Sequence, residues 1–159
     1  MSSNMSSSDC DSETTRVAKL AREPAAVASR IQQFTGPSPQ PALSGYRLVR
    51  PGSPAVYLVD PAGYRRRIAN HTTYTRLFRS WHGIVDTCNL EEIAEGIPIA
   101  NGTILVKGDA GREIYLLDEG LKRALASDSV MDKYWFNWGR VCVIRQVLID
   151  HVPSGDVWQ

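Results

Sequence analysis

Short apolar stretches and polar turns follow each other in the same order twice between Tyr46 and the C-terminus. In each half a two-residue apolar run, at 48–49 and 105–106, leads into a turn. A nearly all-apolar segment follows, at 56–60 (VYLVD) and at 114–118 (IYLLD). Segments of this length and content are typical of strands that are covered on both faces.

A glycine turn comes after each of these strands, at Gly63 and Gly120. The residues beyond the turns, 65–70 and 121–127, complete a β-hairpin pattern. Asn70 and Ser127 then stand where a helix N-cap is expected, because their side chains can accept a hydrogen bond from the first helical turn. Apolar residues at helical spacing follow both caps, so each half is predicted to carry one short amphipathic helix.

The two halves also match beyond the predicted helix. Trp81 and Trp138 coincide, and each precedes an apolar stretch, at 84–85 and 141–144, that could form a further strand. Both halves close on a glycine. Residues 46–102 and 103–159 are therefore interpreted as two tandem repeats.

The predicted fold class is α+β. Each repeat is expected to be a short antiparallel meander with a short helix, and the two repeats are expected to pack with pseudo-twofold symmetry. A unit this small buries too little apolar surface to be stable alone. Each repeat should therefore cover the remaining apolar face of the other.

Five features together resemble a known kind of repeat: a strand with Val-Tyr-Leu, a hairpin with Lys/Arg-Arg, a helix capped by Asn or Ser, an aromatic-x-Trp stretch and a closing Pro-x-Gly. Such repeats recur in tandem in bacterial proteins that are often secreted or surface-associated. The resemblance covers residues 46–159. The first half has Ala94 in place of the closing proline. It implies a repeat architecture, and it carries no catalytic motif and no particular activity.

The segment before the repeats has three parts. Residues 1–12 are mostly serine with scattered acids, which predicts disorder, because such sequence cannot bury enough surface to offset its ordering entropy. Residues 35–45 are rich in proline and predict an extended linker. Between them, 13–34 predicts an amphipathic helical segment whose apolar stripe is a candidate partner-docking face. This stripe contains Val17, Leu20, Val27 and Ile31.

Composition excludes some classes of partner. The sum of lysine and arginine is 18 and that of aspartate and glutamate is 17, so no strong overall charge attracts nucleic acid. No apolar run is long enough to predict a membrane span. The expected partner is another protein or a second copy of this chain, with a glycan as the alternative.

Three cysteines, Cys10, Cys88 and Cys142, occur without a C-x-x-C pair. Their odd number and spacing argue against a disulfide framework and a zinc knuckle, so buried apolar thiols in a reducing compartment are expected. The first ten residues lack the basic and apolar regions of a secretory signal. The expected localisation is cytoplasmic, or export by a route other than Sec.

Candidate ligand-binding residues are the aromatic and basic residues that occupy the same place in both repeats. An arginine stacked on an aromatic ring suits a sugar-binding shelf, although the same contact also serves packing alone. For the two tryptophans, burial in the core is the favoured interpretation, because large rings supply apolar area that a small unit needs. The candidates are Tyr57, Arg66, Trp81, Tyr115, Arg123 and Trp138.

No catalytic residue is assigned, since no phosphate-binding, dinucleotide-binding, zinc-protease or nucleophile-elbow motif occurs. The histidines His71, His82 and His151 have no second ligand at helical spacing, so neither a metal nor another cofactor is expected. A base, an acid and a nucleophile type come within a few residues only at His82, Asp86 and Cys88.

Three functions remain as hypotheses. The first is a non-catalytic interaction and assembly module in which the helical segment 13–34 is a tethered docking element. The second is a glycan-binding module that uses the paired aromatic and arginine residues. The third is a small enzyme with a site near His82 and Cys88, and it ranks below the other two.

Overall fold

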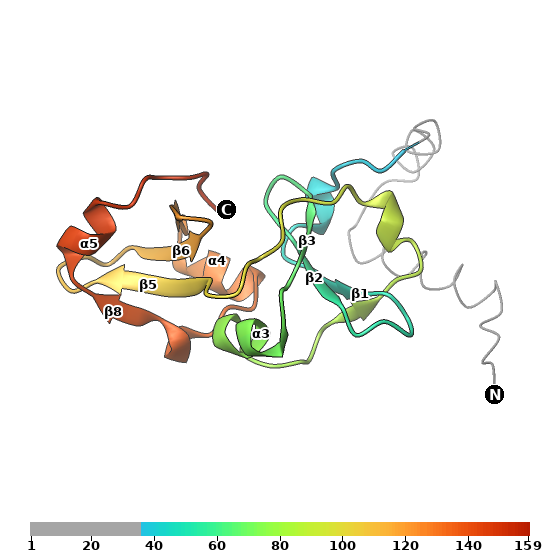
Figure 1. Ribbon diagram of the computed structural model, residues 1–159, viewed down its shortest axis with the longest axis horizontal. Coiled ribbons are helices and arrows are strands. Elements are labelled where there is room, and N and C mark those ends of the chain that lie inside the picture. The colour runs from blue at the N-terminus through green and yellow to red at the C-terminus, as the bar shows by residue number, and fades with distance from the viewer. Residues whose placement is uncertain (1–35) are drawn as a thin grey trace. The chain divides into compact units, whose positions relative to one another are not determined.

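The computed structural model describes residues 36–159, which form two compact units (Figure 1). Among the described residues, unit 1 contains 36–67 together with Gly83–Gly96, and unit 2 contains Ile68–His82 together with Ile97–Gln159. Each unit holds one four-stranded sheet. The fold is α+β, as predicted, and the stripe Val17, Leu20, Val27 and Ile31 lies outside the described residues.

Unit 1 is built on a sheet with strand order β3-β2-β1-β4. The first three strands form an antiparallel meander, and β4 joins β1 in the parallel direction. A small apolar core lies against this sheet and includes Leu48 and Val59. The elements are η1 (Pro41–Leu43), β1 (Arg47–Val49), β2 (Val56–Val59), β3 (Arg65–Arg67), β4 (Val85–Asp86) and η2 (Leu90–Glu92).

The Pro-rich segment packs on unit 1 over most of its described length. The Gln40 backbone N–H donates to the Gly63 carbonyl, and Leu43 is buried in the core. Gly63 has a φ of +92°, and a Cβ there would lie only 2.3 Å from the Pro41 nitrogen. The β2–β3 turn therefore requires glycine for its backbone conformation and for this close approach.

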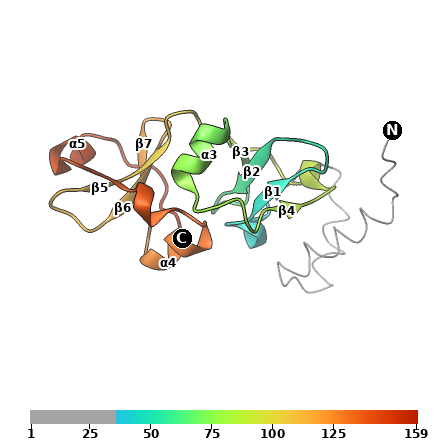
Figure 2. The same ribbon diagram turned by 90° about the horizontal axis from the view of Figure 1, so that it is seen from below.

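Unit 2 has strand order β7-β6-β5-β8 and the same pattern of strand directions as unit 1. Residues 68–82 contribute α3, which lies next to β5 in both ribbon views (Figure 2). The elements are α3 (His71–Leu77), β5 (Ile104–Gly108), β6 (Ile114–Asp118), β7 (Leu121–Ala124), α4 (Asp128–Lys133), η3 (Trp138–Arg140), β8 (Cys142–Ile144) and α5 (Gln146–Asp150).

The two predicted N-caps behave differently. Asn70 Oδ1 accepts a hydrogen bond from the Thr73 backbone N–H at 2.9 Å, which stabilises the first turn of α3. Ser127 makes no such bond to α4, and its hydroxyl lies 2.6 Å from the Ser129 hydroxyl instead. Local sequence therefore locates both helix starts, but it gives the capping bond only for α3.

Aromatic side chains form the core that joins α3 to the rest of unit 2. Phe78 stacks on Phe136 with ring centroids 5.6 Å apart, and Phe136 lies beside Tyr134 and Trp158. All four rings are buried. Their apolar area is the main stabilisation available to two helices of only six and seven residues, which are too short to be stable alone.

An irregular segment runs beside the hairpin in each sheet. In unit 1 the Arg65 N–H donates to the Ala94 carbonyl, and in unit 2 the Lys122 N–H donates to the Pro153 carbonyl. These bonds satisfy the outer edges of β3 and β7, so each sheet has one covered edge. Trp158, near the end of the second segment, enters the aromatic core.

The prediction of buried thiols is wrong for Cys142, which is a free thiol on the surface, whereas Cys88 is half-buried. Cys142 is exposed because β8 is an edge strand, where a side chain has a neighbouring strand on one side only. Within residues 36–159, no helix has both the length and the apolar content that crossing a membrane requires.

Candidate functional site

The sheet of unit 1 separates Tyr57 from Arg66. Tyr57 lies opposite Arg67 on β3, whereas Arg66 lies opposite Leu58 and is only 4% exposed. Neighbouring residues of a strand point to opposite faces, so Tyr57 and Arg66 do not share a face. Arg65 covers the tyrosine instead, with its guanidinium carbon 5.0 Å from the ring centroid.

The same geometry is found in unit 2. Tyr115 lies opposite Ala124, and Lys122 Nζ lies 5.6 Å from the tyrosine ring centroid. Arg123 lies opposite Leu116 and thus on the other face of the sheet. The proposed pairing of each tyrosine with its matched arginine is therefore not formed in either sheet, and the flanking basic residue makes the cation–π contact.

Arg123 is part of an ionic cluster at the β6–β7 turn. Its Nε lies 3.5 Å from Asp118 Oδ2 without the alignment of a hydrogen bond. Asp118 is 1% exposed and accepts a hydrogen bond from the Thr103 hydroxyl at 3.1 Å. The side chain of Asp156 lies 3.9 Å from the guanidinium and is fully exposed. This cluster satisfies a buried carboxylate and holds the hairpin, which is a structural role.

Trp81 is 45% exposed and stacks on Tyr74, with ring centroids 3.8 Å apart. The His71 ring lies 5.0 Å from the Trp81 ring, also stacked. Tyr74 is buried, and its hydroxyl donates to the Ser80 carbonyl at 2.8 Å. A buried, hydrogen-bonded tyrosine therefore fixes a tryptophan that is largely open to solvent.

Trp138 is 44% exposed and begins the 3₁₀ turn η3. Its side chain hydrogen-bonds to Asp132, which also forms a short ion pair with Arg79. The hydrogen bond from Arg79 is the main cause of the lowered pKa of Asp132, and the bond from Trp138 acts in the same direction. Burial in the core, the interpretation favoured from the sequence, is therefore wrong for both Trp81 and Trp138.

Trp135 connects these groups and has an unusual backbone conformation. Its φ is +59°, in the left-handed region where glycine is the usual residue after a helix. The Phe136 N–H donates to the Met131 carbonyl at 2.8 Å, which closes the end of α4. The Trp135 indole N–H donates to the Ser80 hydroxyl at 3.1 Å, and Arg79 lies over the ring.

We call the group formed by Arg79, Trp81, Asp132, Trp135 and Trp138 the aromatic surface. All five residues belong to unit 2 and lie at the C-terminal ends of α3 and α4 or just after them. The contacts above connect them through Tyr74 and Ser80. The surface combines ring faces with one exposed carboxylate and one guanidinium, groups suited to holding a ligand by stacking and hydrogen bonds.

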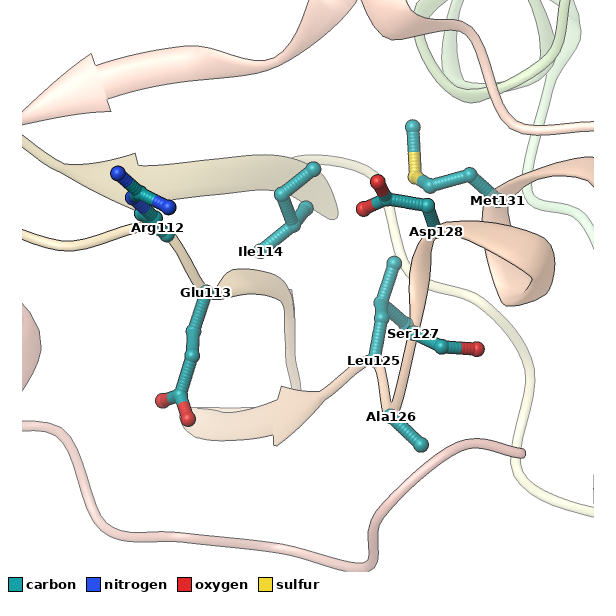
Figure 3. A pocket seen from close by; sticks show the side chains of 8 residues that line it. All are labelled: Arg112, Glu113, Ile114, Leu125, Ala126, Ser127, Asp128 and Met131. Atoms are coloured by element: carbon teal, nitrogen blue, oxygen red, sulfur yellow. The ribbon is translucent and has the colours of Figure 1, made fainter.

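A shallow hollow of about 170 Å³ lies elsewhere in unit 2, beside the start of α4. Figure 3 shows the Asp128 carboxylate directed toward Ile114, with Met131 and Leu125 nearby, whereas the Glu113 carboxylate points away. Glu113 accepts a short hydrogen bond from the Tyr115 hydroxyl. That bond is the largest cause of the raised pKa of Tyr115, about 12, and burial and the charges of Glu113 and Asp150 add to it.

No family model, curated protein or solved structure matches this chain. The function of this protein is therefore inferred from the arrangement of its own residues.

The residues of the third hypothesis are divided between the compact units. His82 belongs to unit 2, whereas Asp86 and Cys88 belong to unit 1. Within residues 36–159 no group of three His, Cys, Asp or Glu side chains could hold a metal ion.

Three residues of the aromatic surface were not predicted from the sequence: Arg79, Asp132 and Trp135. Arg79 and Asp132 come together only when α3 packs against α4, 53 residues further along the chain. Apolar spacing does not reveal a left-handed residue, so the sequence does not distinguish Trp135 from the helical residues before it. The sequence does contain one indication of Trp135: a helix that ends in a left-handed residue usually has glycine there, and no glycine follows α4 directly.

Proposed function

We propose that this protein is a non-catalytic interaction module that assembles with another protein or with a second copy of itself, and that the aromatic surface is its contact region. The observation that carries the proposal is Trp135 in the left-handed conformation. A bulky residue there costs about 1–2 kcal/mol relative to glycine. Folding alone does not require this cost, since glycine would end the helix more favourably.

The composition of the aromatic surface supports the same function. Tryptophan, tyrosine and arginine dominate the energetics of protein interfaces. Trp81 and Trp138 have almost equal exposure, near 45%, and each is held in place by a buried or charged neighbour. Rings that are fixed before binding lose little conformational entropy when a partner covers them.

We also propose that residues 46–102 and 103–159 are tandem repeats related by pseudo-twofold symmetry. Identical strand order in the two sheets supports this proposal. Matching bonds support it further: the Ala69 N–H donates to the Ile99 carbonyl, and the Ala126 N–H donates to the Trp158 carbonyl. In this account α3 belongs to the first repeat by sequence and packs in unit 2 with the second.

The helical segment 13–34 is proposed as a tethered docking element that adds a second contact to the same assembly. Two linked weak contacts give much higher affinity than either alone, because the second contact forms within the complex. Deleting residues 1–35 should therefore weaken association while leaving the far-ultraviolet circular dichroism of the remaining chain unchanged. Unchanged association would remove this role from the segment and leave the aromatic surface as the contact region.

The test compares the double variant Trp81→Ser/Trp138→Ser with the native chain. Light scattering after size exclusion measures self-association, and quantitative affinity capture with mass spectrometry measures other partners. The variant should lose the partner while keeping its far-ultraviolet circular dichroism and a cooperative melting transition, at a lower melting temperature because the stacking on Tyr74 is lost. Tyr64→Ser is the matched control, because Tyr64 is an exposed aromatic residue of unit 1 and should have no effect. Equal association of all three proteins would refute the proposal.

Glycan binding is the second candidate, and the hydrogen bonding of the indoles favours it. Trp135 donates to Ser80 and Trp138 bonds to Asp132, so neither N–H group is directed at a ligand. Arg79 covers the Trp135 ring, whereas the Trp138 ring is 44% exposed and can stack on a sugar. Sugar rings stack on such faces while their hydroxyls bond to a nearby carboxylate. A glycan array with the native chain and the Trp81→Ser/Trp138→Ser variant tests it: only signals that the variant loses count in its favour.

A further inference from the structure

Strand β8 has an open edge. It ends the sheet of unit 2, and within residues 36–159 no strand pairs with its other side. The Asp109 N–H donates to the Ile144 carbonyl at 2.8 Å, so Ile144 directs its backbone groups toward β5. Because successive residues of a strand alternate, Val143 directs its N–H and carbonyl away from β5. Its side chain is 62% exposed.

The corresponding edge of unit 1 carries a charged residue at its centre, whereas the edge of β8 carries a valine there. Asp86 on β4 lies opposite Val49, and Val143 on β8 lies opposite Lys107, so the two residues occupy the same place in their sheets. Charged residues on edge strands prevent pairing with another chain. The other outer edges, at β3 and β7, are covered by bonds from Arg65 and Lys122 to the irregular segments. The edge with Val143 is thus the one in unit 2 left for a partner strand.

Two arginines define the charge of this edge. Arg140 and Arg145 stand on either side of β8, and both are exposed. No ion pair involves either guanidinium in the part of the chain from residue 36 onward. If two copies paired through β8, antiparallel pairing would bring Arg140 of one copy near Arg145 of the other, and like charges at opposite positions are destabilising. The charge therefore disfavours a second copy and favours an acidic partner.

We propose that β8 binds an extended segment of a partner protein that has apolar residues at its centre and acidic residues at both ends. The segment adds a strand to the sheet: its backbone bonds to the N–H and carbonyl of Val143, its apolar side chains cover Val143, and its carboxylates pair with Arg140 and Arg145. Arg140 shares the turn η3 with Trp138 of the aromatic surface, whereas Val143 and Arg145 lie beyond that turn.

The test uses the full chain and fluorescein-labelled heptapeptides, with fluorescence anisotropy as the measurement. The acidic peptide Glu-Glu-Val-Thr-Val-Glu-Glu should bind, and its counterpart with lysine in place of each glutamate should not. Arg140→Glu/Arg145→Glu should weaken the acidic peptide by about tenfold or more and allow the lysine peptide to bind. Arg112→Glu is the charge control, because Arg112 is also exposed in unit 2, and it should retain acidic-peptide binding.

Three further measurements separate strand addition from simple charge attraction. Val143→Asp copies the residue that β4 carries and should weaken the acidic peptide. Val143→Pro removes the outward N–H without changing the charge, so it should also weaken the peptide if a strand is added, and should have no effect if charge alone attracts it. The bound peptide should also slow alkylation of the free Cys142 thiol, measured by mass spectrometry of the tryptic fragment. Equal affinity of the acidic and lysine peptides, or no effect of Val143→Asp or of Val143→Pro, would overturn the proposal.

Two further results would distinguish peptide binding at β8 from self-association and from binding at the aromatic surface. Self-association that Val143→Asp abolishes, without acidic-peptide binding to the native chain, would show that a second copy occupies the edge and would overturn the proposal. The single variant Trp81→Ser should bind the acidic peptide with native affinity, since Trp81 follows α3 and belongs neither to η3 nor to β8. Failure of either proposal can therefore be recognised independently of the other.

Discussion

The guanidinium carbon of Arg79 lies 5.2 Å from the centroid of the Trp135 ring, and Arg79 Nε donates to the Phe136 carbonyl at 2.7 Å. The backbones meet at the same place, because the Arg79 N–H donates to the Trp135 carbonyl and the Asn137 N–H donates to the Leu77 carbonyl. These bonds join the end of α3 to the end of α4 in an antiparallel arrangement. The strained backbone of Trp135 is thus held from several sides, as such conformations must be to persist.

Arg79→Ala is predicted to lower the free energy of unfolding by about 1.5–2 kcal/mol, from one lost bond to a backbone carbonyl and one lost cation–π contact. Chemical denaturation with tryptophan fluorescence measures the change. Asp132→Asn is the control and should have a much smaller effect, because Asp132 is exposed and its ion pair is screened by solvent. If both substitutions lowered the free energy of unfolding equally, the contact of Arg79 with Trp135 would not be the main source of its stabilisation.

The pH dependence of this contact follows from Asp132. Its pKa is lowered from the ordinary value of 3.8, so the ion pair stabilises the folded chain fully above pH 3.8 and less as the pH falls further. The stability difference between the native chain and Arg79→Ala should therefore decrease in acid. The part that remains at low pH reports the contacts with Trp135 and Phe136.

The exposure of the tryptophans shows what residue type alone does not reveal. Large rings are usually buried in small domains, and that expectation fits Trp158, which lies in the aromatic core. Trp81 and Trp138 are the same residue type and also have apolar neighbours in sequence. They lie beyond the C-terminal ends of α3 and α4, where the buried face of each helix no longer continues. Helical spacing identifies the core positions Tyr74 and Leu77, and it no longer applies beyond the last turn.

Arg123→Ala is predicted to lower the free energy of unfolding by about 3 kcal/mol, because it leaves the Asp118 carboxylate buried without its ion pair. The measurement is urea denaturation followed by circular dichroism. Asp156→Asn is the control: the Asp156 side chain is fully exposed, so its loss should change stability little. A loss of stability in Arg123→Ala that Asp118→Asn fails to restore in the double variant would argue that the arginine acts through packing instead.

Tyr115 is predicted to ionise near pH 12, well above the ordinary tyrosine value of 10.0, because its hydroxyl donates to Glu113. The protonated form is favoured in the folded chain, so this group stabilises the fold fully below pH 10.0 and loses its effect as the pH rises toward 12. An ultraviolet absorbance titration should show a tyrosine step near pH 12 that is absent in Tyr115→Phe. Glu113→Ala should move that step toward 10.0; an unchanged step would rule out the hydrogen bond as its main cause.

The sequence predicts most of the strands in each sheet, but it does not predict which residues of the two halves occupy equivalent positions. The hairpin strands and the further strand after each tryptophan appear where the apolar pattern places them. The sequence alignment pairs Leu48 with Leu105, but the registers put Leu48 opposite Tyr57 and Val106 opposite Tyr115. A shift of one residue exchanges the two faces of a strand, and only the pairing with a neighbouring strand determines it. For the same reason Arg65 and Lys122, rather than Arg66 and Arg123, cover the tyrosines.

Glu119→Asn is predicted to stabilise the protein by about 0.5 kcal/mol. Glu119 and Gly120 have φ values of 55° and 74° in the two-residue turn between β6 and β7, and Asn-Gly is the preferred pair for such a turn. The gain from a residue that tolerates positive φ exceeds the loss of the 3.8 Å contact with Arg123, which is partly exposed. Urea denaturation should show a higher midpoint with an unchanged slope. Glu119→Ala loses the same contact and keeps the strain, so it should be the less stable variant; if both variants had the same stability, the turn conformation would not be the cause.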